Sequence, residues 1–239
     1  GFGGFGEDDR VTGIEGGEID GSEGAFDGGI DLIGADEADN IRLIAEDLRN
    51  DRGGRLTVAT SHLHARYTLL APVKAFRERY PEVQLQLIQA DADEVPRMIE
   101  ANEADVGIST DVTRAYPALA LLPCGTIRRS LIMPKGHPLA GKKRVTLEDL
   151  ARYPIVGYGP RSRGGQILAH AFREKGVDAR FVVSASDSDV IKAYVEEGLG
   201  IAIVPALAIG ALTSKLRSSD VTHLFPKSET IVSLRRDGY

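Results

Sequence analysis

The chain has 239 residues, of which 42% are hydrophobic and 27% charged, a composition typical of a soluble globular protein with one large or two small domains. One cysteine excludes an internal disulfide, no Cys/His group has zinc-site spacing, and no apolar run is long enough to span a membrane. The net charge of −6 is unevenly distributed: residues 1–34 contain nine acidic residues and one basic residue, Arg10, and so carry −8. The rest of the chain carries about +2, so the sequence shows no strongly basic surface of the kind that binds nucleic acid.

Residues 1–34 hold nearly half of all the glycines together with many carboxylates. Such a segment loses too much backbone entropy and buries too little apolar surface to fold alone, so the composition predicts a flexible or non-native leader. Its three phenylalanines leave a sticky low-complexity arm as the alternative. The next segment, Asp36–Arg49, places Ile41, Ile44 and Leu48 on one helical stripe, which predicts an amphipathic helix that needs a partner surface.

From Arg55 onward, short apolar runs alternate with helical periods, the pattern of an α/β fold. The predicted strands are Leu56–Thr60, Val83–Ile88, Val106–Ser109, Ala118–Leu122, Ser130–Met133, Ile155–Tyr158, Arg180–Ser184, Gly200–Val204, Val221–Leu224 and Thr230–Arg235. The predicted helices are Ala65–Arg79, Asp93–Ala101, Thr146–Arg152 with Thr146 as N-cap, Gln166–Lys175, Asp187–Glu197 and Ala206–Ala211. We therefore expect two similar α/β units of about 100 residues or fewer, with no classical linker between them.

Four loops follow strands and lead into helices, the position at which open α/β sheets bind ligands. They are Thr60–His64, Ser109–Asp111, Gly159–Gly165 with its two arginines, and Ser184–Ser188. Their hydroxyls, N–H groups and guanidiniums suit a small anion or carboxylate held between the two units. Each loop alone is better explained by helix N-capping, and only the recurrence on both units favours a binding site.

The remaining motifs do not indicate a catalytic site or a phosphate-binding loop. Ser61 has neither a G-x-S-x-G elbow nor an identifiable acid partner for a hydrolase triad. The run Gly136–Lys143 has P-loop spacing, but Lys143 replaces the magnesium-binding hydroxyl and Pro138 removes an N–H group, so we reject a phosphate loop. Cys124 lies among apolar residues and is interpreted as a small buried hydrophobe. We predict no catalysis, cofactor or metal.

Five segments are informative together: Gly54–Tyr67, the Phe76-x-x-x-Tyr80-Pro81 helix end, Leu122-Pro-Cys124, the Gly136–Leu139 turn and Asp189–Ile201. They resemble the effector-binding domain of LysR-type transcriptional regulators, most of all the CysB/Cbl subgroup that controls sulfur assimilation. The resemblance covers about residues 36–239. It implies a periplasmic-binding-protein-like (type II) fold of two Rossmann-like subdomains, a cytoplasmic homotetramer, and a sulfur-related anion or acetylserine-type inducer in the interdomain cleft.

The resemblance also assigns effector-binding positions, which fall on Ser61, Leu63, His64, Thr110, Ile127 and Arg163. Ser61 and Thr110 keep the family's hydroxyls. Leu63 replaces a threonine, His64 a glutamine, Ile127 a tryptophan and Arg163 a threonine of the family pattern. This exchange of lining favours a larger ligand with an anionic head and an apolar or sulfur-bearing body, such as an organosulfonate.

The domain division implied by the resemblance is a leader at 1–35, the end of the linker helix at 36–52, one effector subdomain at 53–128 plus 227–239, and the other at 129–226. Residues 1–34 contain no helix-turn-helix pattern, so promoter DNA and RNA polymerase would be reached only through a full-length regulator. Self-association as a dimer or tetramer is expected, and no membrane contact. The alternatives are a solute-binding protein for a small anion and an enzyme on the same scaffold, against which stand the missing signal peptide and the missing acid/base pair.

Overall fold

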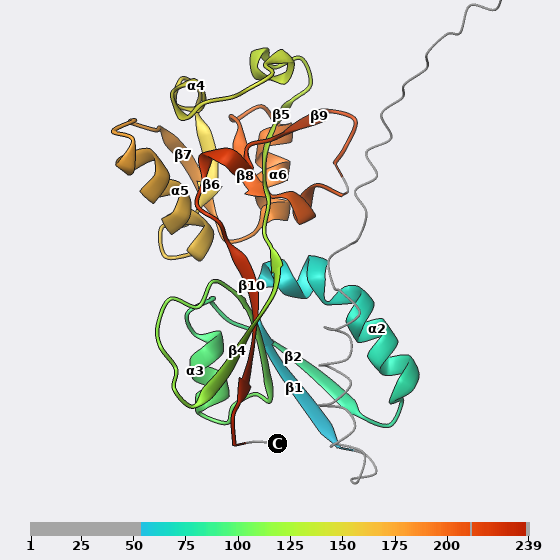
Figure 1. The fold of residues 1–239 in the computed structure, drawn as a ribbon. Helices are drawn as coiled ribbons and strands as arrows, with labels where there is room; N and C mark the ends of the chain where they lie inside the picture. Colours follow the sequence, from blue (N-terminus) through green and yellow to red (C-terminus); the bar gives the residue numbers. More distant parts are fainter. Residues whose placement is uncertain (1–53, 211, 238–239) are drawn as a thin grey trace, which may run out of the picture.

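The computed structural model describes residues 54–210 and 212–237, so the predicted leader and linker helix lie outside the described residues. Two lobes follow from the arrangement of the sheets (Figure 1). Lobe I is the five-stranded sheet with helices α2 and α3, and lobe II comprises the remaining strands with helices α4, α5 and α6. The chain crosses between the lobes from β4 to β5 and returns from β9 to β10 (Figure 1).

Lobe I has the strand order β2-β1-β3-β10-β4, in which β10 is antiparallel to both of its neighbours. Its strands are β1 (Arg55–Thr60), β2 (Gln84–Gln89), β3 (Val106–Thr110), β4 (Leu119–Thr126) and β10 (Glu229–Arg235). Its helices are α2 (Leu70–Arg79) and α3 (Val95–Glu100), preceded by a π-helical turn at His64–Thr68. The predicted strand–helix alternation in this part of the chain is confirmed.

The strand β1 is buried on both faces because it lies between β2 and β3 with apolar clusters on either side. Phe76 of α2 packs on one face with Val58, and Ile99 of α3 packs on the other with Ala59. A small open groove of about 50 Å³ remains beside α2. It is lined by apolar side chains, namely Leu56, Val58, Leu69, Pro72, Val73, Phe76, Leu85, Val106, Ile108 and Val232.

Lobe II contains a three-stranded sheet of order β8-β5-β9 and a parallel pair β6-β7, joined by a bridge between Ile155 and Ile201. Its strands are β5 (Arg129–Pro134), β6 (Ile155–Tyr158), β7 (Phe181–Ala185), β8 (Ala202–Pro205) and β9 (Leu216–Asp220). Its α-helices are α4 (Leu147–Ala151), α5 (Arg163–Glu174) and α6 (Ser188–Glu196). Short 3₁₀ turns lie at Pro138–Gly141, Ala206–Ile209 and Thr222–Leu224.

Helix starts in lobe II follow from their capping side chains. Thr146 accepts a hydrogen bond from the N–H of Asp149, whose carboxylate accepts from the N–H of Thr146, which confirms the predicted N-cap as a complete capping box. Asp187 caps α6 through the N–H of Val190. Ser162 caps α5, so this helix begins at Arg163, three residues before the predicted start.

Two expectations need correction. Val221–Leu224 is no strand: the last three residues form a 3₁₀ turn, and the strand lies just before it at Leu216–Asp220. Its serines and aspartate hide a strand from a search for apolar runs, because only one residue of β9 is fully buried. Cys124 is half-buried rather than buried, because β4 is an edge strand of its sheet.

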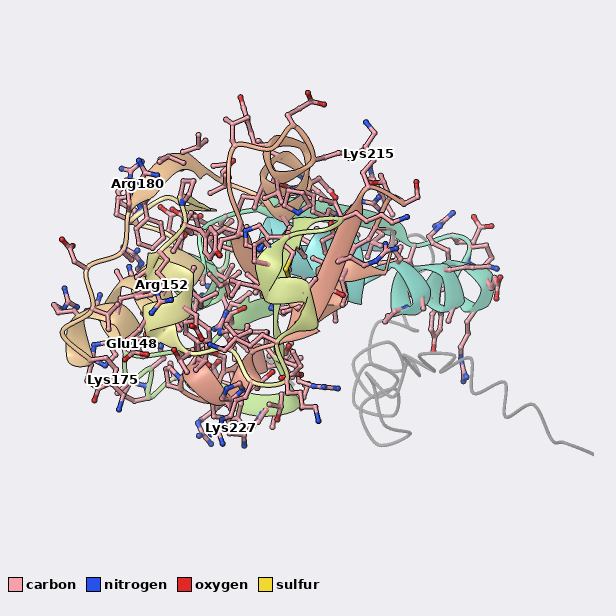
Figure 2. The ribbon with its side chains drawn as sticks, turned by 90° about the horizontal axis from the view of Figure 1, so that it is seen from above. Glu148, Arg152, Lys175, Arg180, Lys215 and Lys227 are labelled. Carbon is pink, nitrogen blue, oxygen red and sulfur yellow. The ribbon has the colours of Figure 1, made fainter. Side chains whose placement is uncertain are left out.

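The surface of lobe II carries charged side chains that extend into solvent, among them Glu148, Arg152 and Lys175 (Figure 2). In the described part of the chain, no helix is long and apolar enough to cross a membrane.

Candidate functional site

The carboxyl ends of β1 and β3 lie side by side, since Thr60 pairs with Ile108 in the parallel register. The loop after β1 begins with Ser61, and Thr110 ends β3. His64 connects the two, because its Nε2 atom lies 3.1 Å from Oγ of Thr110. The structure thus brings three of the sequence-predicted site residues to one edge of the lobe I sheet.

His64 opens the π-helical turn, in which the N–H of Leu69 donates to the carbonyl oxygen of His64 at 2.9 Å. Its imidazole is fully buried, and this burial lowers its pKa to about 4. The ring is therefore neutral at physiological pH and has one donor and one acceptor nitrogen. Both nitrogens are engaged, by Thr68 and Thr110, so His64 positions a hydroxyl and adds no positive charge to the site.

The hydroxyl of Ser61 is enclosed yet has no hydrogen-bond partner among the described residues. Most buried side-chain polar atoms in folded proteins have a partner, so this hydroxyl, which lies in a loop at the edge of the sheet, can still bond a ligand or water. Leu63 lies two residues further on and is half-buried. Ile127 is buried at the crossing into lobe II, where its N–H donates to the carbonyl oxygen of Ser228.

Arg163 reaches the site from lobe II. Its Nε atom lies 3.4 Å from a carboxylate oxygen of Asp111, the residue that follows β3. Asp111 has φ +46°, a left-handed conformation that asparagine and aspartate tolerate best, and its other oxygen accepts from the N–H of Glu229. The predicted cationic residue is therefore already paired with a carboxylate across the lobes.

A second contact between the lobes forms around Asp189 of α6. Tyr67 donates a hydrogen bond to this carboxylate at 2.6 Å, and Lys192 pairs with the same oxygen at 2.8 Å. Arg66 pairs with the second oxygen at 3.5 Å. These donors lower the pKa of Asp189, with Lys192 contributing most and Tyr67 next. The lobes are thus held together by charged and polar contacts on both sides of His64.

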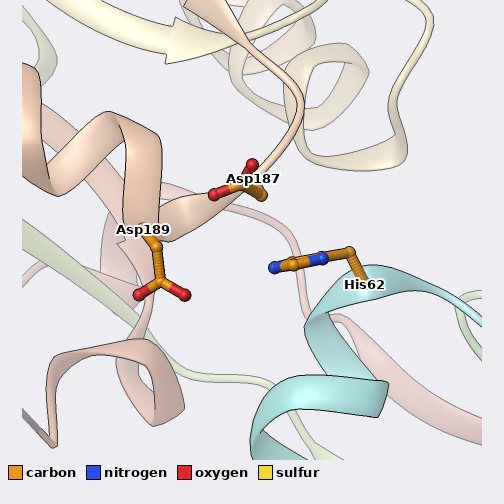
Figure 3. Close-up of side chains that lie close together, drawn as sticks. All are labelled: His62, Asp187 and Asp189. Atoms are coloured by element: carbon orange, nitrogen blue, oxygen red, sulfur yellow. The ribbon is translucent and has the colours of Figure 1, made fainter.

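His62, Asp187 and Asp189 form the group in the described residues that most resembles a metal-ligand set, with ligand atoms within 4.8 Å of one another (Figure 3). Figure 3 shows the imidazole of His62 directed toward the two carboxylates. However, Asp187 caps α6, and Asp189 is neutralised by Lys192 and Arg66. Both carboxylates therefore already have protein partners, while Nε2 of His62 is buried without a hydrogen-bond partner among the described residues.

One charged residue of this region was missed in the sequence. Arg129 begins β5 and is 3% exposed, with Nη2 donating to Oγ of Ser228 at 2.8 Å. Ionisable groups that interact with it electrostatically come from both lobes, namely Tyr158, Asp111 and Arg163. An arginine at the start of the apolar run Leu131–Met133 was the available signal, since charged residues are rarely buried there without a role.

Comparison with known proteins agrees with this geometry. The LysR substrate binding domain family matches residues 49–239. The chain is 38% identical over 204 residues to the HTH-type transcriptional regulator SsuR of Burkholderia cenocepacia and 40% identical over 201 residues to the regulator Cbl of Escherichia coli. These alignments cover 85% and 84% of this chain but only 66% and 64% of the regulators, so the chain spans less than two thirds of their length.

Among solved structures, the cofactor-binding domain of the Cbl transcriptional regulator matches with a TM-score of 0.72 and 39% identity, covering 79% of this chain and 83% of that domain. This match confirms the predicted two-lobed, periplasmic-binding-protein-like fold. The resemblance stated from the sequence is likewise confirmed. The chain belongs to the LysR substrate-binding domain family of transcriptional regulators.

Proposed function

We propose that this chain is the sensing domain of a CysB-like LysR-type regulator, which binds a small sulfur-related anion or organosulfur inducer between its lobes. Through this binding the longer regulator controls transcription of sulfur metabolism genes. The observation that carries the proposal is the enclosed, unpartnered hydroxyl of Ser61 at the carboxyl edge of β1, beside Thr110. A bound ligand would satisfy that hydroxyl, and a bond of this kind contributes about 1 kcal/mol.

The proposed effector-binding residues are Ser61, Leu63, His64, Thr110, Ile127 and Arg163. Ser61 and Thr110 supply hydroxyls, while Leu63 and Ile127 supply apolar surface for the body of the ligand. His64 acts by orienting Thr110, because both of its ring nitrogens are already hydrogen-bonded. This mixture of a polar edge and apolar side chains supports an organosulfonate over bare sulfate.

The proposal extends to the assembly. Promoter DNA and RNA polymerase would be engaged by the full-length regulator, and the chain would associate with itself as a dimer or tetramer in the cytoplasm. Membership of a regulator family supports this over a solute-binding protein delivering its ligand to a transporter. No catalytic step is proposed.

Thermal-shift screening tests the proposal with sulfate, thiosulfate, O-acetylserine, N-acetylserine and a series of alkanesulfonates. A ligand at 100 times its dissociation constant stabilises the folded state by about 2.7 kcal/mol, which moves the melting temperature measurably. We expect at least one sulfur compound to do so. If none does, the proposed inducer class is wrong.

Calorimetry with the best ligand then tests the site. Ser61→Ala should weaken binding about 5-fold, as expected for one lost neutral hydrogen bond. Ser233→Ala is the matched control, because the hydroxyl of Ser233 is also buried without a partner in the described residues but lies on β10 against Gly107. Equal binding by the Ser61→Ala variant and the parent would place the ligand elsewhere.

A further inference from the structure

We propose that Arg129 is the anion anchor of this domain: its guanidinium binds the negatively charged head of the effector at the point where the chain crosses between the lobes. The inference rests on the proposed function, since it concerns the same site, and it names the ligand class as an oxyanion such as a sulfonate or sulfate. In this proposal Arg129, and not Arg163, makes the main charged contact with the ligand.

The first step is the burial of the guanidinium. Arg129 is 3% exposed, and its charged head lies 5.9 Å from the ring centroid of Phe225. Nη2 donates to the neutral hydroxyl of Ser228, while Nε is enclosed without an acceptor among the described residues. Part of a buried, permanent donor set is therefore unused.

The second step is the missing countercharge. Within the described residues no carboxylate forms an ion pair with Arg129. Asp111 is the acidic group that interacts with it electrostatically, but Asp111 pairs with Arg163. The charges of Arg129, Arg163 and Asp111 therefore add to +1 between the lobes.

The third step is energetic. Removing a charge from water without a partner costs several kcal/mol, and arginine does not avoid this cost by losing its proton. Burial lowers the pKa of Arg129, but the guanidinium remains protonated at physiological pH. A domain that keeps such a charge is stabilised when an anion arrives. The planar fork of donors fits the oxygen atoms of a sulfonate, sulfate or carboxylate.

The position of Arg129 between the lobes suggests how anion binding affects the domain. It begins β5, its backbone N–H donates to Thr222, and its side chain bonds Ser228 next to the returning crossing. An anion on Arg129 would therefore lie beside both crossings, and the neighbours Asp111 and Arg163 belong to opposite lobes. A ligand held there is placed to bias the relative position of the lobes.

The test is calorimetry of sulfate and methanesulfonate, with the neutral dimethyl sulfone as a shape control, on the chain and two arginine variants. Arg129→Met removes the charge and keeps most of the volume. We expect it to bind both anions about 10- to 100-fold more weakly. Its melting temperature without ligand should change little, since removing a buried unpaired charge offsets the loss of the hydrogen bond to Ser228. A residue with a purely structural role would instead show a lower melting temperature.

Arg128→Met is the matched control, because this neighbour is exposed and pairs with Asp220 on the surface. It should bind like the parent. If Arg129→Met fails to fold, Arg129→Lys decides: it keeps the charge but loses the fork, so weaker anion binding with a native circular dichroism spectrum supports the proposal. Parent-like affinity in the folded Arg129→Met or Arg129→Lys variant overturns it.

The outcomes separate the two proposals. If the parent binds a sulfur anion and Arg129→Met binds it equally well, the anchor is wrong and the proposed function stands. Acetate and phosphate are titrated in the same way: if the parent binds only these, and Arg129→Met removes that binding, the anchor stands and the sulfur assignment is wrong. If no anion binds the parent, both are wrong.

Discussion

His64 and Thr110 contact each other through Nε2 and Oγ at 3.1 Å, and this contact ties the turn after β1 to the end of β3. The tautomer of His64 decides what Thr110 can offer a ligand. If Nε2 carries the proton, it donates to Thr110, whose own hydroxyl proton is then free for the effector. If Nδ1 carries it, toward Thr68, Nε2 accepts the Thr110 proton instead.

The first prediction concerns acid stability. The pKa of His64 falls from 6.5 to about 4 on folding, so the unfolded chain binds the extra proton between these values. Stability from this residue is therefore complete above pH 6.5 and is lost progressively as the pH falls from 6.5 to 4, by about 3 kcal/mol in total. Urea unfolding from pH 7 to 4.5 should show a shallower loss in His64→Gln than in the parent.

The second prediction concerns the contact between Tyr67 and Asp189. Tyr67→Phe removes a 2.6 Å hydrogen bond to a carboxylate and also the 3.2 Å contact from Lys192. Because the site is partly exposed, we expect a loss of about 1 kcal/mol in the free energy of unfolding. Tyr80→Phe is the control, since its hydroxyl is buried with no partner in the described chain and its removal should be neutral or stabilising. An equal loss in both variants would contradict this assignment.

The third prediction concerns Asp111→Asn. Asparagine tolerates the left-handed backbone and retains an oxygen for the N–H of Glu229, so the fold should survive. The ion pair with Arg163 is lost, and the local charge of the three groups rises from +1 to +2. We expect a few-fold tighter binding of sulfate or methanesulfonate at low ionic strength, with the gain shrinking as salt is added. Calorimetry at two salt concentrations measures this, and weaker binding at both would show that Asp111 itself contacts the ligand.

The fourth prediction concerns packing at the start of α5. A Cβ on Gly165 would lie 2.2 Å from the carbonyl oxygen of Gly159, a backbone atom that cannot move without disturbing the loop. Gly165→Ala should destabilise lobe II by about 1–3 kcal/mol in thermal or urea unfolding. Gly141→Ala meets no atom within 4 Å and should change stability little. If both variants lose the same free energy of unfolding, close packing against the backbone is not what requires glycine at position 165.

Much of the fold could be predicted because the chain's local signals agree with its tertiary structure. Val58 and Ile108 belong to apolar runs that become central strands, and Thr146 and Asp187 are capping residues that begin helices as expected. The exception is β9, whose polar residues pair with β5 through the backbone alone and so leave no hydrophobic pattern. A local hydrophobic period does not predict backbone pairing between distant segments.

The candidate site was predictable only in part. The loops that contain Ser61 and Thr110 were found because they lie at strand ends in a parallel sheet, where loops meet at one edge, and the family resemblance assigned these two residues within them. Arg163 was assigned through the family resemblance, in a loop with two arginines, yet its pairing with Asp111 depends on how the two lobes face each other, which a single sequence does not show. Arg129 was missed for the same reason: its burial and its unused donor arise only when both crossings come together.

The central position of β10 has a consequence for synthesis on the ribosome. β10 lies between β3 and β4, yet about 120 residues of chain separate its first residue from the end of β3. At a translation rate of about 5–20 residues per second, roughly 6–24 s pass between the synthesis of β3 and that of β10, and all of lobe II is synthesised in this interval. During that interval β3 and β4 have exposed edges, and lobe II is free to fold first. Nascent chains of this architecture should therefore depend on chaperone protection of lobe I until the last strand is translated.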